Sequence, residues 1–134
     1  MNVPSQCIEI TCIADGAITA RHALKVTGQS SGTLTVAQAT AATDLFFGFA
    51  RETVATGKTL RVAISGVCEA IAAGVITAGT HNLLSVTADG EVEPYAVGDY
   101  PAAKFLGAKK SSATSAANDV IDVLIVHGFI DTIV

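Results

Sequence analysis

The stretch that decides the fold is FGFARETVATGKTLRVAISGV, residues 47–67. In its second part Leu60, Val62 and Ile64 alternate with smaller or polar residues, which is the period of a half-buried strand. The segment Ala55-Thr56-Gly57 before them has the composition of a turn. We therefore expect a strand on each side of this turn, and we expect the two strands to pair.

The chain repeats this plan once. Gly16-Ala17-Ile18-Thr19-Ala20 recurs as Gly74-Val75-Ile76-Thr77-Ala78, so that position 16 corresponds to position 74. Val62–Val67 finds its counterpart in Leu124–Phe129, where position 66 corresponds to position 128. Because the spacing between the two copies drifts by only a few residues over this length, we infer an internal duplication, with repeats at about 16–71 and 74–133.

Each repeat is expected to hold four strands and two turns. Asp89-Gly90 lies between two alternating segments and is a strong hairpin signal. The expected pairs of strands are His22–Thr27 with Thr33–Val36, Leu45–Ala50 with Thr59–Cys68, His81–Thr87 with Glu91–Tyr95, and Lys104–Ala108 with Val120–Ile130. One more strand, Ile8–Thr11, is expected before the repeats.

These patterns predict a mainly β protein. Two related β-halves of this size close most easily into a small barrel or sandwich, which limits exposed strand edges. The only helix we expect is one or two turns in the Ala-rich segment Ala37–Leu45. The predicted organisation is an N-terminal arm or strand over residues 1–15 and a single β domain over residues 16–134.

Composition restricts the partners. Half of the residues are apolar, only 15% are charged, and the mean hydropathy is +0.51. No apolar run approaches the roughly 20 residues of a membrane helix, so we expect no membrane. The net charge is −4 and the basic residues are scattered, so we expect no nucleic acid. So few charges predict that part of the apolar surface is covered by a partner or by copies of the chain.

The sequence offers no recognisable catalytic or metal-binding motif. Gly57-Lys58-Thr59 resembles the end of a phosphate-binding loop, but position 52 is Glu and the following residues alternate like a strand. His22 and His81 occupy equivalent places in the two repeats and do not converge. We expect no cofactor, no metal and no enzymatic activity.

The N-terminus and the cysteines indicate the compartment. Met1–Gln6 lacks the basic and apolar regions of a signal peptide. Cys7, Cys12 and Cys68 form no CxxC motif, and an odd count argues against a disulfide framework, so we expect reduced thiols. Both features predict a protein made in a cytoplasm.

A family resemblance adds to this interpretation. The strand ending in Ala50, the Ala-x-Gly turn, the alternating strand that ends in Gly66-Val67, and the turn Gly74–Thr80 together resemble a pattern of tailed-phage capsid cement (head decoration) proteins. The resemblance covers roughly Gly16–Phe129. The second repeat shows the pattern less cleanly, since it has Ala116-Ala117-Asn118 in place of a turn with glycine.

The resemblance implies a small β-barrel or β-tulip-like fold without catalytic residues. It implies a structural protein of the virion, made in the host cytoplasm, that binds the major capsid protein on the capsid exterior and stabilises the head. It also implies self-association, with a trimer favoured and a dimer possible. The alternatives are another virion β-module, such as a tail or baseplate component, and a cellular ligand-binding β module.

The N-terminal residues outside the repeats are the expected contact with the capsid. The hypothesis is that they form an arm that adds a strand to a capsid subunit. The arm consists of Asn2, Val3, Pro4, Ser5, Gln6 and Cys7.

Overall fold

The computed structural model describes residues 6–108 and 114–126. Over these residues the chain forms nine strands and no helix, which confirms the mainly β prediction. The strands are β1 (Gln6–Ala14), β2 (Ala23–Ser30), β3 (Thr33–Gln38), β4 (Gly48–Ala50), β5 (Thr59–Ile71), β6 (Leu83–Val86), β7 (Val92–Pro94), β8 (Pro101–Ala108) and β9 (Val120–Ile125).

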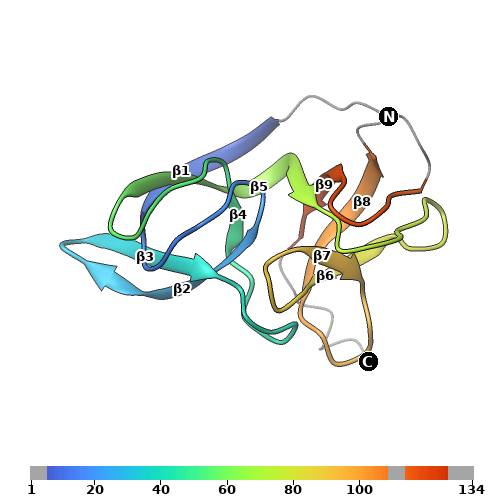
Figure 1. Ribbon diagram of the computed structural model, residues 1–134, viewed down its shortest axis with the longest axis horizontal. Coiled ribbons are helices and arrows are strands. Elements are labelled where there is room, and N and C mark those ends of the chain that lie inside the picture. Colours follow the sequence, from blue (N-terminus) through green and yellow to red (C-terminus); the bar gives the residue numbers. More distant parts are fainter. Residues whose placement is uncertain (1–5, 109–113, 127–134) are drawn as a thin grey trace.

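The first five strands pair in a ring, in the order β1-β3-β2-β4-β5 (Figure 1). The ring closes because β1 pairs with β3 in parallel through Ile13 and Ala14, and with β5 in antiparallel along most of its length. The other neighbours, β3–β2, β2–β4 and β4–β5, are antiparallel. The ring forms the blue-to-green lobe of the molecule.

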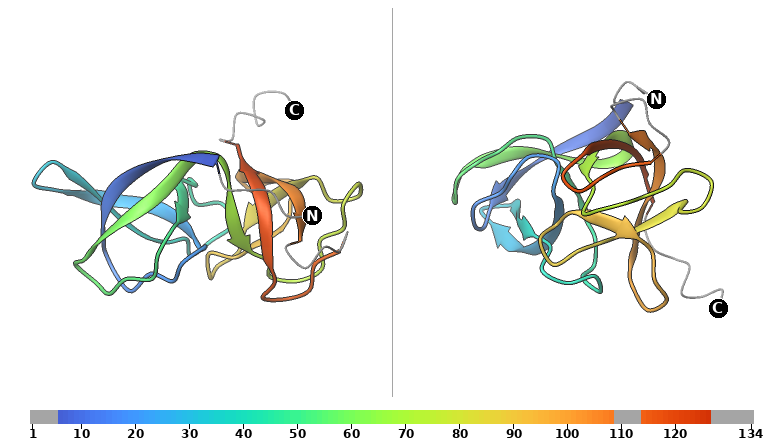
Figure 2. Two further views of the ribbon diagram at one scale, coloured as in Figure 1. Left: turned by 90° about the horizontal axis from the view of Figure 1, so that it is seen from above. Right: turned by 45° about the vertical axis from the view of Figure 1, so that its right-hand side comes forward.

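The other lobe uses the second half of β5. From Val67 to Ile71 this long strand pairs with β9, and the sheet continues in the order β9-β8-β6-β7. At the far end of this order, β7 lies beside the residue that follows β5, through one parallel bridge between Val92 and Ala72. Figure 2 shows the two lobes side by side, joined by β5.

The two lobes share one pairing pattern. In the first lobe the Gly57 N–H donates to the Ala14 carbonyl at 2.8 Å, and in the second the Asn118 N–H donates to the Ala72 carbonyl at 2.8 Å. Gly57 and Asn118 both have positive φ, at 83° and 69°. Asparagine is among the few non-glycine residues that adopt this conformation readily, which explains how the second turn forms without glycine.

All four expected strand pairs are present, as β2–β3, β4–β5, β6–β7 and β8–β9. The boundaries differ from the expected ones. β1 extends beyond Ile8–Thr11 at both ends, β2 runs on to Ser30, and β5 runs on to Ile71. The expected strand Val120–Ile130 is described only as far as Val126.

The expected helix over Ala37–Leu45 is wrong. β3 runs to Gln38, and a turn follows that the Asp44 carboxylate closes by accepting the N–H groups of Thr40 and Ala41 at 2.8 and 3.1 Å. The Ala39 N–H donates to the Ala23 carbonyl at 2.9 Å. A short segment gains little from helix formation because the first helical turn is costly to nucleate, so these contacts determine its conformation.

The core has two parts, one for each lobe. The first-lobe cluster contains Cys12, Ala14, Ile18, Leu24, Val36, Ala50, Leu60 and Val62. The larger cluster fills the second lobe and also takes in Phe46, Phe49 and Ala63 from the first repeat. The rings of Phe46 and Phe49 contact each other at a centroid distance of 4.9 Å. The lobes are therefore packed together through the segment around β4.

Candidate interaction surfaces

The expected capsid-contact arm is placed only in part. Asn2, Val3, Pro4 and Ser5 lie outside the described residues. Gln6 and Cys7 belong to β1, where they pair with Val67 and Gly66 of β5. These two residues therefore already form part of the sheet on one side.

The other side of β1 is a strand edge. The Ala14 N–H points toward β5 and donates to the Lys58 carbonyl at 2.8 Å, whereas the Asp15 N–H points toward β3 and donates to the Val36 carbonyl at 2.7 Å. The N–H and C=O groups of successive residues point to opposite sides of a strand. The backbone N–H and C=O groups of Cys7, Glu9 and Thr11 therefore point to the same side as those of Asp15, away from β5. Within residues 6–108 and 114–126, no strand pairs with β1 on that side before Ile13.

Beside this edge lies an apolar strip. Ile8 is 62% exposed and Leu124, on β9, is 36% exposed. Leu124 lies opposite the half-buried Val67 of β5, which in turn lies opposite Gln6 of β1. Ile8 lies two residues from Gln6 on the same face of β1, so it is a diagonal neighbour of Val67. Ile8, Val67 and Leu124 thus lie on three neighbouring strands and form a surface on which a partner would bury apolar area.

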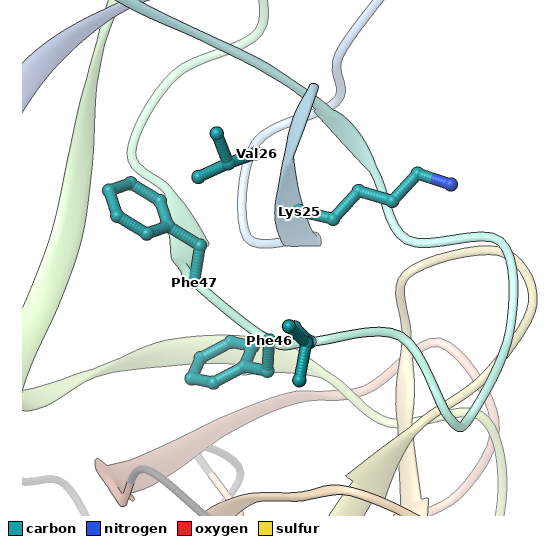
Figure 3. Close-up of a pocket in the computed structure, with 5 residues that line it drawn as sticks. Lys25, Val26, Phe46 and Phe47 are labelled. Carbon is teal, nitrogen blue, oxygen red and sulfur yellow. The ribbon is translucent and has the colours of Figure 1, made fainter. Parts of the chain in front are cut away.

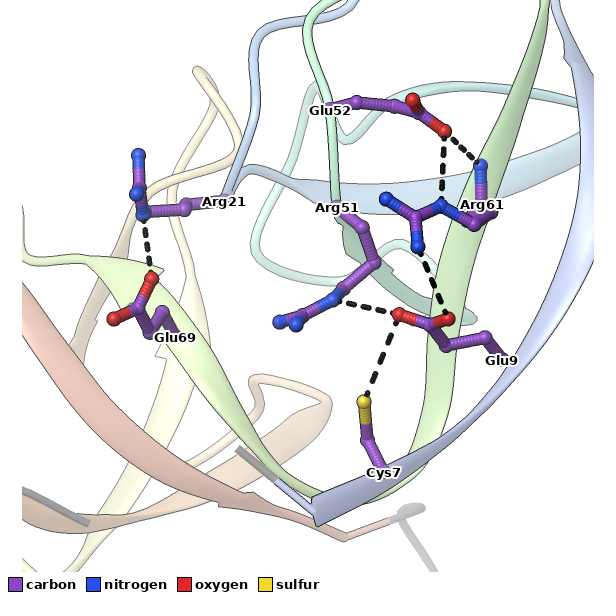
Figure 4. Close-up of polar contacts among 7 residues, drawn as sticks. All are labelled: Cys7, Glu9, Arg21, Arg51, Glu52, Arg61 and Glu69. Atoms are coloured by element: carbon purple, nitrogen blue, oxygen red, sulfur yellow. Dashed lines mark hydrogen bonds and ion pairs between the residues drawn. The ribbon is translucent and has the colours of Figure 1, made fainter. Parts of the chain in front are cut away.

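Ion pairs tie β1 to β5 and to the segment after β4 (Figure 4). The Glu9 carboxylate accepts a hydrogen bond from Arg51 Nε at 2.8 Å and lies 3.7 Å from a terminal nitrogen of Arg61. Glu52 accepts the Arg61 N–H at 2.8 Å, and this bond is the main cause that lowers the pKa of Glu52. The charge of Glu9 on the open edge is therefore balanced by two arginines.

A second apolar surface lies beside β2. Lys25, Val26, Leu45, Phe46 and Phe47 line a hollow of about 390 Å³ (Figure 3). Leu45 is 71% exposed there and Val26 is 43% exposed. The Lys25 ammonium donates to the Thr40 hydroxyl at 2.8 Å, so its aliphatic part is what faces the hollow.

Two histidines, His22 and His81, bond within their own turns. His22 Nδ1 lies 3.0 Å from the Ala20 carbonyl, and His81 Nδ1 accepts the Thr77 N–H at 3.1 Å. In the described part of the chain, no three His, Cys, Asp or Glu side chains gather closely enough to hold a metal ion. The same part contains no helix long and apolar enough to span a membrane.

The three cysteines differ in access. Cys12 and Cys68 are fully buried, and burial raises the pKa of both thiols, that of Cys68 to about 12. Cys7 is half-buried and packs against the second-lobe core. All three thiols are free in the structure.

Comparison with known proteins adds a structural similarity. Neither a protein-family profile nor a curated protein sequence matches the chain. Among solved structures, the chain is similar to the N base of head fiber gp8.5 in bacteriophage phi29, with a TM-score of 0.68. The two are 15% identical, and the match covers 92% of this chain and 97% of the other. The likeness establishes a shared fold over nearly the whole of both chains.

Proposed function

We propose that the chain is a structural protein of a phage head. The observation that carries this proposal is the similarity to the base of a phage head fiber over 92% of the chain. The sequence pattern supports the same class of protein, because the strand and turn motifs over Gly16–Phe129 resemble those of capsid cement proteins.

Within that class, we propose a cement or decoration protein on the outer surface of the head. It would bind the major capsid protein, self-associate, and act by buried area alone, without catalysis. The apolar strip beside β1 and the hollow beside β2 supply surfaces for such contacts. A subunit that bridges neighbouring capsid proteins raises the free energy needed to separate them, because it binds only the assembled arrangement.

The proposal is tested by sedimenting heads assembled without this protein, from the phage or prophage that encodes it, in the presence of increasing amounts of the purified chain. We expect retention that saturates at a fixed number of chains per capsomer. No retention, or retention that rises linearly without saturating, would overturn the proposal. An unrelated acidic protein of similar size is the control for trapping.

The same assay tests the N-terminal arm. If residues 2–7 contact the capsid as expected, removing residues 2–5 should weaken retention, while Lys58→Ala, on an exposed turn, should not. Unchanged retention after the deletion would exclude residues 2–5 as the capsid contact without excluding the head-protein proposal.

A further inference from the structure

We propose that two copies of this chain pair through the open edge of β1, antiparallel across a two-fold axis at Ile8. The inference deepens the self-association included in the proposed function, but it is argued from one strand edge and not from the likeness to a phage head protein. It rests on three observations: the strand that pairs with the equivalent edge in the second lobe, the absence of proline and lysine from β1, and the arginines that balance the charge of Glu9.

The second lobe shows what occupies such an edge. Ala14 and Ala72 make equivalent hydrogen bonds, so the end of β5 corresponds to the end of β1, with Ala72 in the place of Ala14. With Ala72 aligned to Ala14, Gly66 of β5 aligns with Ile8 of β1, and Val67 aligns with Glu9. The edge at Gly66 and Val67 carries an antiparallel strand, and that strand is β1 itself.

In the first lobe the corresponding edge carries no strand within the described residues. Its backbone donors and acceptors at Cys7, Glu9 and Thr11 are a template for one more strand. A second β1 is a suitable occupant, because the equivalent edge of β5 carries an antiparallel strand. Two identical open edges that pair in antiparallel satisfy each other, which is the property of an isologous interface.

β1 lacks most of the features that protect natural edges. Residues 6–14 contain no proline and no lysine. The register shifts from Ile8↔Ser65 to Glu9↔Ala63, so the extra residue is Ile64 and the bulge lies in β5. β1 itself stays regular and remains able to pair on its free side.

A two-fold axis at Ile8 would bury the exposed isoleucine side chains and would pair the free backbone groups of β1. Ile8 would lie directly opposite its own copy in a non-hydrogen-bonded pair, where side chains approach most closely, and this buries two exposed isoleucines. Cys7 of each copy would then exchange backbone hydrogen bonds with Glu9 of the other. The Glu9 carboxylates would not oppose each other, and each is balanced by Arg51 and Arg61.

The first test is light scattering of the full chain at several concentrations. We expect twice the mass of the 13.6 kDa chain for the wild type, and the mass of a single chain for Ile8→Glu. The substitution separates the copies because it sets two carboxylates opposite each other. Val97→Glu is the matched control, since Val97 is 98% exposed and lies in the loop between β7 and β8. Thermal melts of both variants report that the chain is still folded.

The second test is disulfide trapping in the Cys7→Ser background. Ile8→Cys should form a dimer under mild oxidation, because opposed residues in such a pair have Cα atoms about 4.5 Å apart, within the range of a disulfide. Val97→Cys should not. A wild-type chain that stays monomeric, or an oligomer that survives Ile8→Glu and gives no Ile8→Cys dimer, would overturn the inference.

Head binding separates the remaining outcomes. A monomer whose sedimentation with heads is lost in Ile8→Glu would assign the edge to a strand of the head shell and would overturn pairing between copies. A dimer that binds no head would leave this inference standing and would contradict the proposed function.

Discussion

At the scale of single residues, Gly48 shows how closely β4 approaches β5. A Cβ atom at this position would clash with the Ala63 carbonyl oxygen and would lie 2.8 Å from Val62 Cγ1. Phe49 and Ala50 beside it are fully buried, so the surrounding core restricts any shift of β4 away from β5. The small residue therefore fixes the distance between two strands that join the lobes.

We expect Gly48→Ala to destabilise the fold by roughly 1–3 kcal/mol, because the added methyl group overpacks the contact between β4 and β5. Chemical denaturation followed by circular dichroism measures the change. Gly74→Ala is the control, since nothing lies within 4 Å of its added Cβ, and its midpoint should change little. Equal midpoints for the two variants would contradict this account of Gly48.

The buried thiols give a second prediction. Cys12 and Cys68 should react with a thiol reagent at about pH 8 only after denaturation, because burial excludes the reagent and raises the pKa of both thiols. Mass spectrometry of labelled peptides locates the modified cysteines. Rapid labelling of Cys68 in the native protein would show that the second-lobe core is open.

At the scale of elements, strands and turns with a local sequence signal were predicted correctly, whereas conformations that go with longer-range contacts were not. The hairpin at Asp89-Gly90 and the alternation of β5 are local signals, so the four strand pairs could be predicted. The left-handed φ of Asn118 was not predicted, because it accompanies a hydrogen bond to Ala72, which lies far away in the sequence. The error over Ala37–Leu45 came from counting alanines and overlooking Asp44, whose carboxylate captures the N–H groups that a helix would need.

The candidate surfaces were harder to predict than the strands. The alternation of Ile8, Ile10 and Cys12 is visible in the sequence and would have supported a longer first strand. That one side of this strand is open is a tertiary property, because it depends on where β3 stops pairing with β1. The hollow at Leu45 likewise depends on the turn that replaces the expected helix.

The turn closed by Asp44 should depend on pH. Hydrogen bonds from Thr40 and Ala41 and the charge of Lys25 lower the pKa of Asp44. A folded-state pKa below the unfolded value means that the contribution is complete above the unfolded pKa, near 4, and is lost as the pH falls through the lower folded value. Asp44→Ala should therefore cost roughly 1–2 kcal/mol at pH 7 and much less in acid.

Denaturation of the wild type and of Asp44→Ala at several pH values checks this prediction. The two stability curves should converge as the pH falls below about 4. Asp89→Ala, on the exposed hairpin turn, is the control, and its difference from the wild type should remain small throughout. A constant gap between wild type and Asp44→Ala would contradict the assigned cause.

At the scale of the whole molecule, the two lobes should unfold as one unit. They share β5, and Phe49 from the first repeat lies in the second-lobe core. Leu60→Ala in the first-lobe core should cost about 2–5 kcal/mol. Both tyrosines, Tyr95 and Tyr100, lie in the second repeat, so their fluorescence reports the other lobe.

We expect tyrosine fluorescence and circular dichroism to give the same lowered midpoint in Leu60→Ala. A tyrosine transition that stays at the wild-type midpoint would show that the lobes unfold independently, and would contradict the role assigned to β5 and Phe49.

The most direct test of the central claim is electron cryomicroscopy of heads assembled without this protein, imaged with and without the purified chain. We expect added density on the outer surface, at a repeated position of the lattice, into which the two-lobed fold fits. Heads that look the same with and without the chain, under conditions in which the protein is folded, would contradict the proposal that the chain is a phage head protein.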